Sequence, residues 1–345
     1  MRVAVLRRTR ELAIEERPLP IPGAGEVLVQ VTAVGVCGSD VHYWERGAIG
    51  PFVVRAPLVL GHECAGVVAG LGPGVPASLE AGVRVALEPG LPCGTCRSCR
   101  EGRYNLCPEI RFWATPPYDG AFAEYVVHPA SHCFPLPPGV SDEAGALLEP
   151  LSTGVQAVRR GRIGPGSQVL VTGLGPIGLV NVMAALAAGA ARVFGSDPLP
   201  ARCAAAAALG AEVLAPQLPP PEAAAELGRL AGNGIDAAVE CSGAPAALEL
   251  CCLAVRPGGA VVLIGLGGDR AELPIAHLQT REVDLIPVFR YAHTYPAALA
   301  WVARGRAPVE RLITHRFPLG RVAEAFEGTR VAGSDAIKVM IDPQA

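Results

Sequence analysis

The stretch that decides the fold runs from residue 168 to residue 178 and reads Gln-Val-Leu-Val-Thr-Gly-Leu-Gly-Pro-Ile-Gly. Its first five residues predict a buried β-strand, and an apolar helix is predicted to follow as far as about Ala188. Gly173 permits a tight turn, Gly175 lets the backbone approach a pyrophosphate, and Gly178 lets the helix and strand pack closely. A turn shaped by glycines for structural reasons alone is the alternative. The strand, turn and helix in this order are typical of a dinucleotide site.

The residues downstream repeat the alternation of strand and helix. Further strands are predicted at residues 192–196, 211–214, 236–240, 260–265 and 283–288, with helices ending near Leu209 and at residues 222–231. Because helices separate consecutive strands, the strands are expected to lie parallel in one sheet. The predicted fold class of this half is α/β, a doubly wound Rossmann sheet.

Asp197 stands at the end of the second predicted strand, nineteen residues after Gly178. A carboxylate at this place is suited to accept hydrogen bonds from both ribose hydroxyls, and its negative charge would repel a 2′-phosphate. The helix N-terminus offers unpaired N–H groups to the phosphates. The sequence therefore favours NAD over NADP. The nearby Arg202 is a cation that could weaken this preference.

The first half of the chain has a different pattern, in which Gly and Pro interrupt short β-segments. Strands at residues 3–6, 26–36, 64–71, 84–88 and 121–127 predict a mainly β, barrel-like domain. A helix at residues 295–304 and an apolar run at 337–341 are expected to return to it. The predicted domains are therefore 1–150, 151–288, and 289–345 as the return to the first domain.

Four cysteines fall within fifteen residues of a Gly-rich stretch: Cys93, Cys96, Cys99 and Cys107. Thiolates at this spacing can converge on one tetrahedral Zn²⁺ and so fold a lobe of about residues 90–110. Disulfides are the alternative, but the charged N-terminal residues do not resemble a secretory signal. The pattern indicates a closed, structural zinc site.

Composition excludes several classes of protein. Half of the 345 residues are hydrophobic, 18% are charged, and the formal net charge is −3. This balance is typical of a globular protein, and no basic block offers a surface for nucleic acid. Glycines, Pro176 and Asn181 interrupt the most apolar stretch, residues 169–191, so it suits a buried strand and helix better than a bilayer span. We expect a cytoplasmic protein without nucleic-acid or membrane partners.

A second set of candidate metal ligands lies in turns of the first domain. It comprises Cys37, His62, Glu63 and Glu149. A mixed sulfur, nitrogen and oxygen set that leaves one position open is what a catalytic zinc requires. Each residue alone has a structural explanation, such as a core thiol or a helix cap. Their combination upstream of a dinucleotide fold favours an enzyme with one catalytic and one structural Zn²⁺ per chain.

These motifs together resemble the zinc-dependent medium-chain alcohol dehydrogenases, most closely the sorbitol (L-iditol 2-) and xylitol dehydrogenases. The resemblance covers nearly the whole chain and is most specific at residues 36–44, 61–63, 102–106, 114–117, 149–152, 288–291 and 314–319. It implies a GroES-like catalytic domain and NAD-dependent oxidation of a polyol to a ketose. Animal sorbitol dehydrogenases lack the four-cysteine lobe, which leaves the preferred substrate open.

The resemblance also implies roles for individual residues. Cys37, His62 and either Glu63 or Glu149 would bind the catalytic zinc. The substrate would meet Tyr43, Phe112, Thr115, Glu149, Arg290 and Tyr291. Beyond the glycine-rich turn, NAD would contact Ile177, Asp197, Arg202, Ile264, Gly265, Leu266, Val288, Phe289 and Arg290. The family commonly forms oligomers, so a homotetramer or homodimer is expected.

A proton path is hypothesised from Ser39, two residues past Cys37, through the ribose hydroxyls of the cofactor to His42. Glu149 joins these two residues as a catalytic candidate. A turn hydroxyl that bonds its own backbone is the alternative for Ser39. Two other activities of the same superfamily stay open, threonine 3-dehydrogenase and butanediol dehydrogenase. A catalytically silent NAD-binding zinc protein is the alternative outside enzymes.

Overall fold

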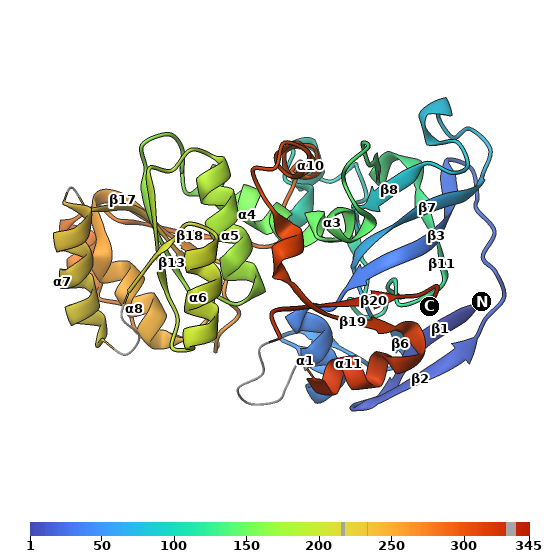
Figure 1. Ribbon diagram of the computed structural model, residues 1–345, viewed down its shortest axis with the longest axis horizontal. Coiled ribbons are helices and arrows are strands. Elements are labelled where there is room, and N and C mark those ends of the chain that lie inside the picture. Colours follow the sequence, from blue (N-terminus) through green and yellow to red (C-terminus); the bar gives the residue numbers. More distant parts are fainter. Residues whose placement is uncertain (215–217, 233, 269, 329–335) are drawn as a thin grey trace. The chain divides into compact units, whose positions relative to one another are not determined.

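The computed structural model describes residues 1–214, 218–232, 234–268, 270–328 and 336–345. These residues form two compact units (Figure 1). Unit 1 comprises Met1–Glu149 and Val309–Ala345, and unit 2 comprises Pro150–Pro308. The chain therefore leaves unit 1, builds unit 2 and returns. The return starts at Val309, later than the residue 289 that we expected from the sequence.

The late return has a physical reason in the segment that follows the last strand of unit 2. Arg159 of α4 (Leu148–Arg160) donates a hydrogen bond to the carbonyl oxygen of Ala292 at 3.1 Å. Helix α10 (Tyr295–Ala303) buries Tyr295 almost completely. A hydrogen bond and apolar packing thus hold this segment in unit 2.

Unit 2 is built around a parallel sheet with the strand order β15–β14–β13–β16–β17–β18. The strands are β13 (Gln168–Thr172), β14 (Arg192–Ser196), β15 (Glu212–Val213), β16 (Ile235–Glu240), β17 (Val255–Leu263) and β18 (Asp284–Pro287). The direction of winding reverses between β13 and β16, which is where a doubly wound sheet binds its ligand. The Rossmann prediction is confirmed.

Helices cover this sheet. They are α5 (Pro176–Ala187), α6 (Pro200–Ala208), α7 (Pro220–Ala231), α8 (Pro245–Ala254) and α9 (Ile275–Thr280). Helices α5 and α6 pack on β14, whereas α7 and α8 pack against each other and on β16. Leu170 and Phe194 of the sheet share an apolar cluster with Leu227 of α7 and Leu250 of α8. Burial of these side chains joins the layers of unit 2.

The turn between β13 and α5 depends on its glycines. Gly173 has a φ of 78°, a backbone conformation that residues with a side chain rarely adopt. A Cβ at Gly178 would lie 1.8 Å from the carbonyl oxygen of Gly173. The first turn of α5 can therefore approach the strand this closely only with glycine at position 178.

Unit 1 is mainly β. Its larger sheet has the order β12–β8–β7–β3–β20–β19, and β11 also pairs with β3. These strands are β3 (Glu26–Gly35), β7 (Glu63–Leu71), β8 (Arg84–Leu87), β11 (Tyr125–Pro129), β12 (Cys133–Pro135), β19 (Ile313–Pro318) and β20 (Lys338–Asp342). The smaller sheet, β2–β1–β6, contains β1 (Arg2–Arg8), β2 (Glu11–Glu16) and β6 (Leu58–Val59).

Shorter elements complete unit 1. They are the pairs β4 (Ala48–Ile49) with β5 (Phe52–Val53) and β9 (Gly90–Leu91) with β10 (Arg111–Phe112), and the helices α1 (Gly38–Arg46), α2 (Arg97–Arg100), α3 (Asp142–Ala146) and α11 (Val322–Gly328).

Strand β11 begins at Tyr125 rather than at residue 121, where the sequence pattern predicted its start. The preceding residues instead bond to other segments, since Phe122 accepts from Ala4 N–H and donates to the carbonyl of Leu60.

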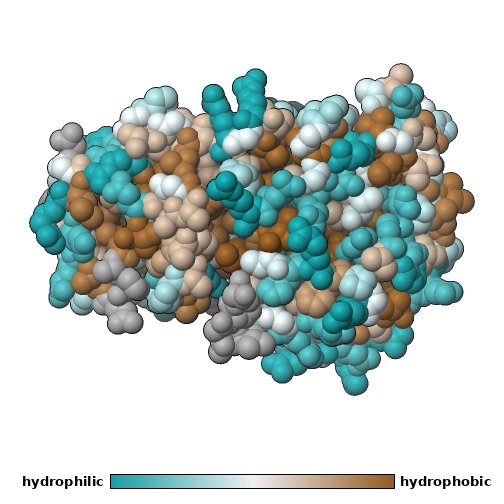
Figure 2. All heavy atoms as spheres, viewed as in Figure 1, coloured by the Kyte–Doolittle hydropathy of each residue, from teal (hydrophilic) through white to brown (hydrophobic). Residues whose placement is uncertain are grey.

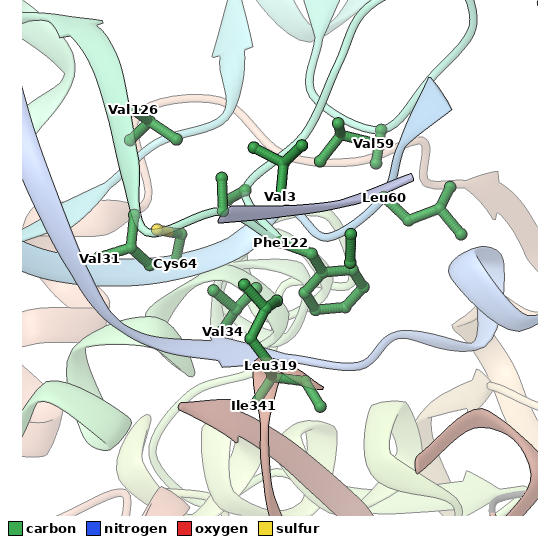
Figure 3. Close-up of a cluster of buried hydrophobic side chains, with 14 of the residues drawn as sticks. Val3, Val31, Val34, Val59, Leu60, Cys64, Phe122, Val126, Leu319 and Ile341 are labelled. Carbon is green, nitrogen blue, oxygen red and sulfur yellow. The ribbon is translucent and has the colours of Figure 1, made fainter. Parts of the chain in front are cut away.

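The core of unit 1 joins segments that are far apart in the sequence. Val3 of β1, Val34 of β3 and Phe122 pack in one cluster with Leu319 and Ile341 from the C-terminal return (Figure 3). All five side chains are at most 1% exposed. The C-terminal residues are therefore part of the core of unit 1 rather than an appendage.

Polar and apolar residues are interspersed on the face of the protein drawn in Figure 2. Among the residues that the structure describes, none of the helices combines the length and the apolar character needed to cross a bilayer. The apolar stretch at residues 169–191 instead contributes β13 and α5 to the interior of unit 2.

Gly178→Ala should destabilise the protein, because the added methyl group would clash with the carbonyl of Gly173. Overpacking of this kind lowers the free energy of unfolding by about 1–3 kcal/mol. Gly228→Ala is the matched control, since a Cβ there meets nothing within 4 Å and alanine is the better helix former. Thermal melts should show a lower Tm for the first variant and an equal or higher Tm for the second. The reverse order would contradict this packing.

Candidate active site and zinc lobe

The candidate metal ligands Cys37, His62 and Glu63 converge in unit 1. One ligand atom of each lies within 4.8 Å of those of the other two. Strand pairing explains the convergence, because Gly35, the last residue of β3, lies opposite Glu63, the first residue of β7. Cys37 follows β3 and His62 precedes β7. The two turns that carry these side chains therefore meet at one edge of the sheet.

Asp40, which the sequence analysis did not single out, joins these two turns. Its buried carboxylate accepts hydrogen bonds from the backbone N–H groups of Cys37 and Gly61, each at 3.0 Å. It also lies 3.6 Å from Nδ1 of His62. The sequence did contain a pattern that could have predicted this role, namely the spacing of Cys37 and Asp40. An acid at the third position of a helix often accepts a hydrogen bond from the backbone N–H of the N-cap residue.

The charges around His62 fit a bound cation. Burial lowers the pKa of His62, but Asp40 and Cys37 raise it by more, so that it lies well above its usual value. Surroundings that favour a proton on the imidazole favour a metal cation for the same electrostatic reason. Thiolate sulfur, imidazole nitrogen and carboxylate oxygen are also the ligands that zinc takes in proteins. This donor set therefore fits a zinc ion.

Glu63 has a buried cationic partner, Lys338, which is the single lysine of the chain. Nζ of Lys338 donates to Oε1 and Oε2 of Glu63 at 2.7 and 2.8 Å, and to the carbonyl oxygen of Val36 at 3.1 Å. Burial lowers the pKa of Lys338, but Glu63, Cys37 and Glu149 raise it by more. Because Lys338 is the single lysine, the sequence could have marked it as unusual. Nothing in the local sequence, however, predicts that residue 338 pairs with residue 63.

Glu149, the fourth predicted ligand, is not a member of the group formed by Cys37, His62 and Glu63. It is buried in the first turn of α4. Its charge nevertheless acts on Lys338, because it helps to raise the pKa of that ammonium group. The structure thus gathers three of the four predicted ligands, and a direct ligand role for Glu149 stays a prediction.

The other predicted residues of unit 1 lie on α1 and near β10. The ring centroid of Phe112 is 5.7 Å from that of His62, which places an aromatic wall beside the metal ligands. Ser39 and His42 both belong to α1 and are partly buried. Tyr43 packs in the apolar core of unit 1, and Thr115 is partly buried. Their roles toward substrate stay predictions.

The four cysteines of the predicted lobe also converge, with their sulfur atoms within 4.8 Å of one another. The sulfurs of Cys96 and Cys99 are 3.5 Å apart, and those of Cys93 and Cys107 are 3.6 Å apart. These distances far exceed the ~2.05 Å of a disulfide bond. All four residues are free thiols. The arrangement fits four thiolates around one ion.

Backbone amides of this lobe donate hydrogen bonds to its sulfur atoms. Hydrogen bonds from Thr95 and Cys96 lower the pKa of Cys93 to about 6. The N–H of Cys96 donates to the Cys93 sulfur at 3.3 Å, and the N–H of Cys93 donates to the Cys107 sulfur at 3.4 Å. Donors aimed at sulfur stabilise the thiolate form, which is the form that binds zinc.

Asp197 directly follows β14 in unit 2, and its carboxylate already has partners within the protein. Oδ2 accepts a hydrogen bond from the N–H of Leu174 at 2.7 Å, and Oδ1 accepts one from the N–H of Leu199 at 2.9 Å. Nη1 of Arg202 lies 3.6 Å from Oδ2. Asp197 thus ties the glycine-rich turn to the end of β14, a role that the sequence did not reveal. Each oxygen keeps a lone pair for a ribose hydroxyl.

The remaining predicted cofactor residues follow the carboxyl ends of sheet strands. Ile177 lies in the first turn of α5, Ile264, Gly265 and Leu266 follow β17, and Val288, Phe289 and Arg290 follow β18. A Cβ at Gly265 would lie 2.2 Å from the backbone nitrogen of Gly243, so this loop also requires glycine. Because carboxyl ends of parallel strands share one edge, these loops border the same edge as the glycine-rich turn.

Arg290 has a backbone conformation that is unusual for a residue with a side chain, with a φ of 52°. Its guanidinium group lies 4.9 Å from the ring centroid of Phe289. Strained residues of this kind cluster at functional sites. Tyr291 next to it is buried, with its ring centroid 5.9 Å from that of Tyr295.

Comparison with known proteins adds to this geometry. The family model described as "Alcohol dehydrogenase GroES-like domain" matches residues 23–138, and that described as "Zinc-binding dehydrogenase" matches residues 176–304. Sorbitol dehydrogenase of Gallus gallus is 46% identical over 341 residues, which cover 98% of this chain and 96% of that protein.

Solved structures resemble the chain over nearly its full length. L-idonate 5-dehydrogenase from Escherichia coli has a TM-score of 0.90 and 31% identity, covering 99% of this chain and 97% of its own. A protein from E. coli CFT073, described as a short chain alcohol dehydrogenase and complexed with cofactor NADH, has a TM-score of 0.89 and 28% identity, covering 99% of both chains. By its sequence identity and its two family domains, the chain belongs to the zinc-dependent medium-chain alcohol dehydrogenases.

Proposed function

We propose that this protein is an NAD-dependent polyol dehydrogenase, which oxidises a secondary hydroxyl group to a ketone and so yields a ketose and NADH. The observation that carries the proposal is the convergence of Cys37, His62 and Glu63 within 4.8 Å, in a chain that also has a Rossmann unit. The likeness to sorbitol dehydrogenase and L-idonate 5-dehydrogenase supports a polyol-type substrate.

Cys37, His62 and Glu63 would hold the catalytic zinc, with Glu149 as a further candidate ligand. Zinc bound there supplies a Lewis acid that lowers the pKa of a substrate hydroxyl. Asp40 orients the two ligand-bearing turns through its hydrogen bonds to their amides. Cys93, Cys96, Cys99 and Cys107 would hold a second zinc with no open position, and so give the lobe its fold.

Ser39 and His42 suit the movement of the proton that the substrate hydroxyl loses. They lie three residues apart on α1, and therefore on one face of the helix. Oγ of Ser39 would accept this proton, and His42 would lie at the far end of the path, beyond the ribose hydroxyls of the bound cofactor. His42 is only partly buried, so it can release the proton to solvent.

Polar side chains suit the remaining hydroxyl groups of a polyol. As the family resemblance implies, Tyr43, Glu149, Arg290 and Tyr291 would offer donors and acceptors to the substrate, and Phe112 and Thr115 would line its pocket. A site made of such groups rejects a plain alkyl alcohol, which would leave them unpaired. Threonine and butanediol, the substrates of the competing activities, would engage fewer of them.

NAD is the proposed cofactor. The buried carboxylate of Asp197 disfavours a 2′-phosphate through charge repulsion, and a structural neighbour of this chain is complexed with NADH. The glycine-rich turn and the loops after β17 and β18 would contact the dinucleotide. Arg202 is the residue that could weaken the preference for NAD over NADP.

A cytoplasmic homodimer or homotetramer completes the proposal. The free cysteines of the chain suit a reducing compartment such as the cytoplasm. Strand β18 ends the strand order in unit 2, so within the described residues no further strand pairs with its outer edge. Such an edge is suited to pairing with the same edge of a second copy.

Cys37→Ser should abolish polyol oxidation and leave NAD binding measurable, because the metal ligand is the thiolate. Loss of several kcal/mol of Lewis-acid stabilisation corresponds to at least about a hundredfold decrease in kcat/KM. Cys133→Ser is the control, since the Cys133 thiol donates to the carbonyl of Pro129 and a hydroxyl can do the same. Turnover by Cys37→Ser within tenfold of the wild type would contradict the metal role.

Cys96→Ser should lower the Tm more than it lowers the rate of the surviving enzyme, because it opens the closed thiolate cluster of the lobe. A loss of about 2 kcal/mol corresponds to roughly 4–8 °C in Tm for a domain of this size. Ser98→Ala, in the same lobe but not a ligand, should melt like the wild type. Unchanged melting of Cys96→Ser would rule out a structural zinc there.

Initial rates of NAD reduction with sorbitol, xylitol, galactitol, threonine and 2,3-butanediol should identify the substrate class. The best polyol is expected to exceed threonine and butanediol in kcat/KM by at least about tenfold, since only a polyol pairs with all the polar groups of the site. A preference for threonine or butanediol would favour the alternative activities. Failure to turn over any of the five would favour a silent NAD-binding protein.

A further inference from the structure

Glu240 is a buried carboxylate of unit 2 that has no part in the proposed chemistry. It is the last residue of β16 and is 3% exposed. Strand β16 lies between β13 and β17, so that Thr172 is opposite Glu240 on one side and Leu263 is opposite it on the other. The glycine-rich turn follows Thr172, and the loop at residues 264–266 follows Leu263. Glu240 therefore lies between the starts of two predicted cofactor loops.

The side chain of Glu240 holds the turn at residues 242–243, which follows β16. Oε1 accepts hydrogen bonds from the backbone N–H groups of Ser242 and Gly243 at 2.7 and 2.9 Å, and it accepts another from the hydroxyl group of Ser242. Oε2 lies 3.1 Å from the nitrogen of Gly243. Hydrogen bonds to a charged acceptor are stronger than those between neutral groups. The carboxylate thus fixes one short turn.

This carboxylate has a chemistry that a neutral side chain of the same shape lacks. Within the described residues, all of its hydrogen-bond donors are uncharged. A buried charge is tolerated only where hydrogen bonds replace those of water. A glutamine could not make the same bonds, because its NH₂ group is a donor and would face the N–H of Gly243. The turn therefore requires both acceptor oxygens of Glu240.

The turn at residues 242–243 packs directly on the glycine-rich turn. A Cβ at Gly173 would lie 2.6 Å from the Cβ of Ser242 and 2.8 Å from its backbone nitrogen. The N–H of Cys241 also donates to the carbonyl oxygen of Thr172 at 2.9 Å. Because Gly173 follows Thr172, a displacement of residues 242–243 would also displace the start of the glycine-rich turn.

The same turn contacts the loop at residues 264–266. A Cβ at Gly265 would lie 2.2 Å from the nitrogen of Gly243 and 2.6 Å from Oε2 of Glu240. The N–H groups of Ile264 and Gly265 donate to the backbone carbonyl oxygen of Glu240 at 2.9 and 3.0 Å. The main chain of Glu240 therefore holds this loop, while its side chain holds the turn that separates the loop from the glycine-rich turn.

We propose that Glu240 is a positioning residue of the cofactor site, whose carboxylate sets the spacing between the glycine-rich turn and the loop at residues 264–266. The inference rests on the proposed function, because it takes these two segments to contact NAD. Glu240 acts through the turn at residues 242–243 and needs no contact with the dinucleotide. Groups that orient a binding site from behind commonly affect its affinity in this way.

The test is the dissociation constant of NADH, followed by the fluorescence of the bound nicotinamide, in the wild type and in Glu240→Gln. The Kd should rise by at least about tenfold, since the variant leaves a buried amide without an acceptor. The KM for NAD should rise in parallel. The kcat at saturating NAD should fall by no more than about threefold, because the candidate metal ligands lie in unit 1. A lower Tm with a smaller rise in Kd would indicate a purely structural role and overturn the inference.

Two further variants serve as controls. Glu249→Gln removes an exposed carboxylate from α8 of the same unit and should leave the Kd within about twofold of the wild type. An equal rise in this variant would overturn the inference. Ser242→Ala keeps Glu240 and both backbone donors but removes the hydroxyl donor, so the Kd should rise by at least about twofold. If Glu240→Gln does not fold, a smaller rise in Ser242→Ala would overturn the inference.

The wild-type protein separates the two proposals. Wild-type protein that binds neither NAD nor NADH would refute the proposed function itself. Wild-type protein that binds NADH, combined with equal binding by folded Glu240→Gln, would overturn the role of Glu240 and leave the proposed function intact.

Discussion

The pairing register of β3 with β7 is the constraint on which the candidate active site depends. Gly35 lies opposite Glu63, so the turns that carry Cys37 and His62 leave the sheet side by side. A slip of one residue would turn the ligands toward opposite faces. Strand β20 pairs with the other edge of β3, where Met340 lies opposite Gly35, and this pairing brings Lys338 to the same place.

Charges can be buried at this site because each has partners. Asp40 accepts from two backbone amides, and Glu63 accepts from Lys338. In the form that binds zinc, Cys37 is a thiolate and His62 a neutral imidazole, so the carboxylates of Asp40 and Glu63 and this thiolate would outnumber the positive charge of Lys338. A divalent cation would balance this excess of negative charge. Both the charges around this site and the types of ligand in it therefore suit a metal centre.

Local patterns predicted much of the fold and many of the residues that gather at the two candidate metal sites. The glycine-rich turn and the four lobe cysteines were readable because their residues are close in sequence, and the parallel sheet followed from alternating strands and helices. Asp40 and Lys338 were not predicted as parts of the site. The return to unit 1 was placed too early, because the contact of Arg159 with Ala292 is a tertiary interaction.

By itself the sequence determined which residues could bind zinc and a dinucleotide, since ligand chemistry and glycine geometry belong to the residues themselves. Only the tertiary structure decided which candidates meet. It grouped Cys37 with His62 and Glu63 and left Glu149 outside that group. It also gave Glu63 a partner 275 residues away. The physical reason is that strand register and the C-terminal return, which no local pattern encodes, set the distances between side chains remote in sequence.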